Sequence, residues 1–92
     1  MIVRILGEGQ LQVDDSASTE LNSLDAALEN AVNSGDEAAF RSALVALLDR
    51  VRAVGTPLAA DALEPSDSIL PRADADLDEV RSMLTDEGYI PG

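Results

Sequence analysis

Two runs of apolar residues at helical spacing, joined by a very short link, constrain the fold of this chain most. The first run follows one face of a helix over residues 16–34, and the second does the same over residues 36–54. The junction between them is formed by Ser34, Gly35 and Asp36. Glycine tolerates the left-handed backbone that closes a helix, and aspartate caps the helix that follows. Because the connection is so short, we expect the two helices to fold back on each other as an antiparallel αα-hairpin.

The faces that these two helices would bury are built from aliphatic side chains and one aromatic ring. They consist of Leu21, Leu24, Leu28 and Val32 in the first helix and Phe40, Ala43, Leu44, Leu47, Leu48, Val51 and Val54 in the second. On the opposite side of the second helix, Glu37 and Arg41 are one turn apart, which predicts an ion pair. Val45 falls on that same side, as an ordinary exposed valine or as part of an interaction surface. Gly55 ends the helix, because Pro57 cannot continue it.

The N-terminal residues predict a β-hairpin over residues 1–13. The first arm is apolar and β-branched apart from Arg4, the second alternates polar with apolar residues, and a Gly-Glu-Gly turn joins them at residues 7–9. An isolated hairpin is only marginally stable in water. We therefore expect it to pack on the helices or to recruit a further strand.

The last third of the chain has a weaker pattern. Residues 58–73 contain two prolines and are predicted to be irregular or to form a short strand at residues 69–70. A third helix is predicted over residues 76–87, because Asp76 is followed three residues later by Glu79, the spacing of a capping box. The apolar face of this helix consists of Leu77, Val80 and Leu84.

Together these elements predict an α+β fold, mostly helical, in one domain over residues 1–92. An N-terminal β-hairpin packs on the antiparallel αα-hairpin, and a short C-terminal helix completes the arrangement. With one Phe and one Tyr in the chain, the core has to be built mainly from Leu, Val and Ile.

The composition removes most of the side chains on which enzymes depend. The sequence has no histidine, cysteine, lysine or tryptophan. Catalytic triads, thiol chemistry and zinc sites of the Cys/His type are therefore excluded. Carboxylate pairs are abundant, but catalytic pairs of that kind act in sizeable clefts, for which a domain this small has little room. The sequence predicts no enzyme, no catalytic residue and no cofactor.

Charge points to the kind of partner. Eighteen acidic residues against six arginines give a net charge of -12. This balance disfavours direct binding to nucleic acid or to an anionic membrane and favours a basic protein partner, although the charge has a simpler use in keeping the protein soluble. The absence of cysteine fits a reducing compartment, and the first residues lack the pattern of a signal peptide. We therefore expect a cytoplasmic protein.

Two short motifs resemble ligand-binding sequences and fail on closer inspection. The acids at 74, 76 and 78 resemble the start of a calcium loop, but its sixth and twelfth positions hold Glu79 and Thr85 in place of glycine and glutamate. Acids crowding a helix N-terminus explain this cluster better, and no metal site is predicted. The Gly-Glu-Gly sequence at residues 7–9 lacks the third glycine of a dinucleotide loop, because Gln12 occupies that position.

Arg4 is the one charge in an otherwise apolar predicted strand. A structural interpretation has it extend to water or pair with a buried acid. A functional interpretation has it contact a partner.

Four segments of the chain resemble, in order and spacing, the family of PspA-associated proteins called PspAA. They are residues 1–10 (MIVRILGEGQ), 64–71 (EPSDSILP), 77–81 (LDEVR) and 86–91 (DEGYIP). The resemblance implies a bacterial accessory protein of the phage-shock, or envelope-stress, system. Its partner would be PspA, a coiled-coil protein of the ESCRT-III-like membrane-remodelling kind. It also implies that any contact with the inner membrane is peripheral and passes through that partner.

The acidic start of the third helix is the candidate partner-binding surface. It comprises Asp74, Asp76, Asp78 and Glu79. Such a surface suits a basic or amphipathic helix, because complementary charge steers the encounter. An exposed edge of the hairpin is a second candidate, since it would accept another strand. The alternative function is an acidic regulator that mimics nucleic acid and occupies a basic DNA-binding protein, which would need carboxylates in regular rows.

Overall fold

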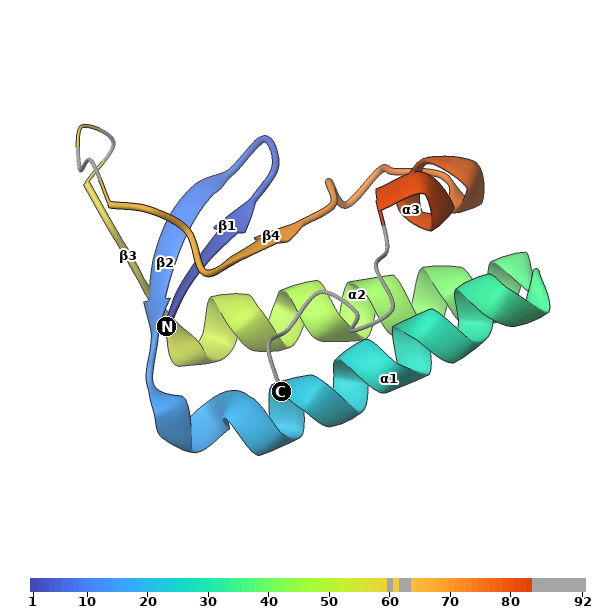
Figure 1. The fold of residues 1–92 in the computed structure, drawn as a ribbon, viewed down its shortest axis with the longest axis horizontal. Helices are drawn as coiled ribbons and strands as arrows, with labels where there is room; N and C mark the ends of the chain where they lie inside the picture. Colours follow the sequence, from blue (N-terminus) through green and yellow to red (C-terminus); the bar gives the residue numbers. More distant parts are fainter. Residues whose placement is uncertain (60, 62–63, 84–92) are drawn as a thin grey trace.

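In the computed structural model, which describes residues 1–59, 61 and 64–83, a small sheet lies against a pair of antiparallel helices (Figure 1). The strands are β1 (Ile2–Ile5), β2 (Gly9–Val13), β3 (Gly55–Pro57) and β4 (Ser68–Leu70). The helices are the 3₁₀ turn η1 (Asp15–Ala17), α1 (Ser18–Ser34), α2 (Glu37–Val54) and α3 (Leu77–Met83). The predicted α+β class, with its hairpin, paired helices and short C-terminal helix, is confirmed.

The helix boundaries follow from local chemistry. Asp14 accepts a hydrogen bond from the Ser16 amide (2.8 Å) and so starts η1, which moves the beginning of α1 to Ser18 from the expected residue 16. Gly35 closes α1 with a φ of 73°, in the left-handed region that glycine enters without strain. One residue later, the Asp36 carboxylate accepts from the Ala39 amide (3.1 Å) and caps α2.

The predicted hairpin becomes the centre of a four-stranded sheet. β1 and β2 pair antiparallel, and the strand order is β3-β2-β1-β4. β4 pairs parallel with β1, in agreement with the short strand predicted at residues 69–70. β3 pairs antiparallel with β2 and was not expected. Both edges of the hairpin are therefore occupied. The expectation of an exposed hairpin edge that accepts a partner strand is wrong.

The new edge at β3 is a poor acceptor for another strand. Pro57 has no amide hydrogen, and the Gly55 amide already donates to the Val51 carbonyl at the end of α2. An edge strand that lacks free donors resists pairing with a further chain. This edge offers a partner few backbone contacts.

Helix α2 runs directly into β3 through Gly55, without a linker. A Cβ atom at Gly55 would lie 2.7 Å from the Val51 carbonyl oxygen and 2.9 Å from Leu11 Cβ. Gly55→Ala is therefore expected to lower the free energy of unfolding by about 1–3 kcal/mol, the usual cost of overpacking. Urea denaturation followed by circular dichroism measures the change. Ala53→Ser, at an exposed position of the same helix, is the control and should change stability by less than about 0.5 kcal/mol. An unchanged Gly55→Ala variant would contradict the close contact.

The hydrophobic core lies between the helix pair on one side and the sheet and α3 on the other. It consists of Val3, Ile5, Leu11, Val13, Leu21, Leu28, Ala31, Val32, Phe40, Leu44, Leu47, Leu48, Val51, Leu70, Ala75, Leu77 and Val80. As predicted, aliphatic side chains dominate, with Phe40 the largest fully buried one. Leu24 and Val54 are only partly buried. The exposed large apolar side chains in the described part of the chain are Val45 (44% exposed) and Ile69 (47%).

Candidate partner-binding surface

The four acids singled out from the sequence lie together around the start of α3, and all are exposed. Asp76 caps the helix as predicted, because its carboxylate accepts a hydrogen bond from the Glu79 amide (2.8 Å). Asp78 and Glu79 occupy the first helical turn, and Asp74 precedes them in the connecting segment. We call Asp74, Asp76, Asp78 and Glu79 the acidic α3 surface.

Two arginines neutralise part of this charge. Arg72 Nε lies 3.3 Å from an Asp74 oxygen, and Arg81 lies 3.6 Å from an Asp78 oxygen. All four side chains in these pairs are more than half exposed, so each pair is weak and easily exchanged for a partner's cation. Four carboxylates against two arginines leave the acidic α3 surface negative.

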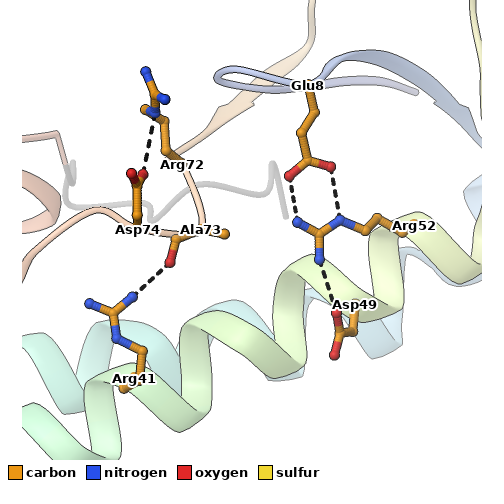
Figure 2. A network of polar contacts seen from close by, with 7 residues as sticks. All are labelled: Glu8, Arg41, Asp49, Arg52, Arg72, Ala73 and Asp74. Atoms are coloured by element: carbon orange, nitrogen blue, oxygen red, sulfur yellow. Dashed lines mark hydrogen bonds and ion pairs between the residues drawn. The ribbon is translucent and has the colours of Figure 1, made fainter.

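Arg41 holds the segment that carries these acids. Its guanidinium donates to the carbonyl oxygens of Ala73 (2.7 Å) and Ala75 (2.8 Å), and it lies over the Phe40 ring at 5.1 Å (Figure 2 shows the Ala73 bond). The predicted ion pair with Glu37 is thus replaced by a tertiary contact. Two hydrogen bonds from a charged donor contribute more stability than one exposed ion pair within a helix. Arg41 therefore bonds the two carbonyls of this irregular segment and not Glu37. Arg41 fixes the approach to α3.

Helix α3 is anchored from below by its apolar face. Leu77 and Val80 are buried as predicted, and Arg81 donates to the Val32 carbonyl (3.2 Å) near the end of α1. The other predicted member of this face, Leu84, lies outside the described residues. Because the buried face and the capping residue set the orientation of the helix, its acids are turned to the solvent.

A second polar network ties the tip of the hairpin to α2. Arg52 Nε donates to one oxygen of Glu8 (2.9 Å), its terminal nitrogen contacts the other oxygen, and a further bond reaches Asp49 (2.9 Å) (Figure 2). The hydrogen bond from Arg52 holds the pKa of the Glu8 carboxyl below its ordinary value. This two-bond geometry fixes the turn relative to the helix.

Glu8→Gln should cost stability only where Glu8 is ionised. Since the folded pKa of Glu8 is lowered, its ion pair contributes stability above the unfolded value near 4.5, and the contribution disappears as the pH falls through the folded value. We expect a loss of about 0.5 kcal/mol at pH 7, in the range for exposed pairs. The variant and the wild type should converge as the pH falls through the lowered pKa of Glu8 in the folded protein. Thermal denaturation of both proteins between pH 3 and pH 8 measures this. A difference that stays constant with pH would contradict the ion pair.

Arg4 extends outward from β1, in agreement with the interpretation that it reaches water. Val3 and Ile5 on either side of it are fully buried against the helices, so the strand alternation directs Arg4 to the other face of the sheet. Arg4 also helps to line a cavity of about 400 Å³, which Arg52 of α2 lines as well. The remaining lining residues are Glu8, Gly9, Gln10, Leu11, Arg52, Pro57, Leu58 and Ala59.

Comparison with known proteins identifies the family. The family model of the PspA-associated proteins, PspAA, matches residues 1–92. The chain belongs to the PspAA family. No curated protein and no solved structure matches it. The match covers every residue that the resemblance in the sequence used, and it links this PspAA chain to PspA through the family description.

The sequence identified the acids of this PspAA chain but missed the residues that position them. The i,i+3 spacing of Asp78 and Arg81 was a usable signal for their pairing. The contact of Arg41 with residues 73–75 had no local signal, because the partners are 32 and 34 residues away. The cavity beside Arg4 also depends on segments far apart in the chain.

Within residues 1–59, 61 and 64–83, no three acidic side chains come close enough to hold a metal ion. None of the helices in the described part of the chain combines the length and apolar character needed to cross a bilayer.

Proposed function

We propose that this PspAA chain is a non-catalytic accessory protein that binds a PspA-like coiled-coil protein. In doing so it modulates the role of that protein in the envelope-stress response. The family match, whose description names association with PspA, is the observation that carries the proposal. The net charge of -12 supports a protein partner that presents a basic surface.

The acidic α3 surface is the proposed docking site for a basic helix of this partner. Three contacts hold it in place before binding: the Asp76 cap, the two bonds from Arg41, and the buried Leu77 and Val80. Preorganisation of this kind reduces the entropy lost on association. Opposite charge then accelerates the encounter, and the effect weakens with salt because the Debye length is about 10 Å at 0.1 M.

The proposal includes a location. A PspA-like partner brings the complex to the inner membrane, while the PspAA chain itself stays cytoplasmic and meets the bilayer only through that partner. Its acidic exterior supports this arrangement, because anionic lipids repel it.

Co-purification followed by sizing tests the proposal most simply. The PspAA chain and the PspA-family protein from the same organism are mixed, separated by size-exclusion chromatography with light scattering, and titrated against each other calorimetrically. We expect a shared peak and a Kd of about 10 μM or tighter at 0.1 M salt. No association at 100 μM of both proteins would contradict the proposed function. Capture of a basic DNA-binding protein in its place would favour the nucleic-acid mimic.

A further inference from the structure

Arg4 differs from the other five arginines. The others make these contacts: Arg41 with two backbone carbonyls, Arg50 with Glu20, Arg52 with Glu8 and Asp49, Arg72 with Asp74, and Arg81 with Asp78. Among the residues that the structure describes, Arg4 has no ion pair and no side-chain hydrogen bond. Yet carboxylates outnumber arginines by 18 to six. Within the described residues, one cation therefore stays unpaired in a strongly acidic chain.

The backbone of Arg4 is held in place by the sheet. It lies in the inner strand β1, opposite Gln10 of β2 and Ile69 of β4. Gln10 is only 9% exposed, and its amide nitrogen donates to the Glu64 carbonyl (2.7 Å) and to the Ser66 hydroxyl (2.8 Å). The Cα position of a residue on an inner strand with such neighbours is well defined, as a specific contact requires.

The cavity beside Arg4 combines this cation with apolar walls. Leu11, Pro57 and Leu58 supply the walls, and the volume of about 400 Å³ falls in the range of ligand-sized pockets. Its other charged lining residues, Glu8 and Arg52, are bonded to each other through two contacts. The charge that is available to a ligand there is that of Arg4.

Building on the proposed function, we propose that Arg4 and this cavity receive an aspartate or glutamate side chain of the PspA-family partner. The guanidinium forms a two-bond contact with the carboxylate, while Leu58 covers its aliphatic stem. The exposed Ile69 is the neighbour of Arg4 in β4 and adds an apolar contact beside it.

The long-range field favours this occupant over a free anion. A small anion has to approach a protein of net charge -12 unaided, whereas a carboxylate on a basic partner arrives with compensating positive charge. The contact also adds specificity, which the acidic α3 surface lacks. A row of acids attracts any basic helix, but a single cation in a cavity selects one acid and so fixes the register of the partner.

Replacing Arg4 distinguishes this proposal from long-range electrostatic attraction alone, because the two predict opposite changes in the Kd. Arg4→Gln makes the chain more negative, so long-range attraction alone would tighten binding to a basic partner. The proposal predicts a Kd about tenfold weaker for Arg4→Gln and a smaller loss for Arg4→Lys, which keeps the charge but not the planar fork. Arg50→Gln removes another exposed positive charge, from α2, where it pairs with Glu20, and should leave the Kd within twofold.

The titration uses the full PspAA chain and the purified PspA-family protein at 0.1 M salt. Unchanged melting temperatures of the variants establish that they fold. If Arg4→Gln unfolds, the affinity of Arg4→Lys is the test, and the proposal predicts that it is weaker than that of the wild type. If the wild type binds and Arg4→Gln binds equally or more tightly, this inference is wrong while the proposed function stands. If the wild type does not bind, both are wrong.

A charge exchange provides the second arm of the test. Arg4→Glu is titrated against partner variants in which exposed acids are replaced one at a time by arginine. We expect one partner position to recover about tenfold of the lost affinity. Failure of every position to recover binding would overturn the proposed carboxylate contact.

Discussion

Phe40→Ala is expected to lower the free energy of unfolding by about 3–5 kcal/mol, the usual cost of removing a buried aromatic ring. The Phe40 side chain is 1% exposed and is the largest fully buried one in the described part of the chain. Its removal leaves a cavity in the hydrophobic core that the neighbouring side chains fill only in part. A domain of this size has a stability of about 5–14 kcal/mol, so the loss is a large fraction of the total.

Urea denaturation followed by circular dichroism measures the effect of Phe40→Ala, and the melting temperature should fall by about 15 °C or more. Val45→Ala is a matched control, because Val45 lies on the same helix and is 44% exposed. The control should change stability by less than about 0.5 kcal/mol. A loss below 1 kcal/mol for Phe40→Ala would show that α2 does not bury this face against the core.

Phe40→Ala should also loosen the segment before α3. The ring supports the Arg41 guanidinium, and Arg41 in turn holds the carbonyls of Ala73 and Ala75. Hydrogen exchange at residues 73–80 should therefore accelerate more than exchange in β2, relative to the wild type.

Reversing the acids of the α3 surface should weaken partner binding by about 100-fold. In the triple variant Asp74→Lys, Asp78→Lys and Glu79→Lys, Asp76 is retained because its carboxylate caps α3. The net charge changes from -12 to -6, and three attractive contacts with a basic helix become repulsive. The dependence of the Kd on salt should flatten as well, because these charges carry the screened part of the attraction.

A second triple variant controls for net charge. Asp15→Lys, Glu37→Lys and Asp61→Lys change exposed acids elsewhere in the chain and give the same total charge of -6. Calorimetric titration of both variants with the PspA-family protein at 50 mM and 300 mM salt gives the comparison. If the two variants lose affinity equally, the effect belongs to the charge of the whole chain, and the acidic α3 surface is not the docking site.

The helix pair was predictable because its determinants are local. Gly35 and the aspartates at 36 and 76 act within one turn of their own positions, as the caps and the positive φ show. Strand β3 was not predictable, because Gly55 and Pro57 give only a stop signal for a helix. Their pairing with β2 joins residues more than 40 positions apart, and nothing in three residues specifies such a partner.

The same division holds for the candidate site. The acids were predictable from their spacing ahead of an apolar helical face. The contacts that hold them were not predictable, because Arg41 bonds carbonyls 32 and 34 residues away and not a glutamate in its own helix. Only the tertiary fold brings those carbonyls close to Arg41. Arg4 was recognisable as unusual in an apolar strand, but its cavity forms only when residues 57–59 run beside the start of β2, where the Leu58 amide donates to the Gln10 carbonyl.

Hydrogen exchange of the PspAA chain, alone and saturated with the PspA-family protein, tests the docking site most directly. The account predicts slower exchange in the complex at the amides of residues 74–80, with the outer faces of α1 and α2 little changed. A stable complex in which residues 74–80 exchange as fast as in the free chain would contradict it.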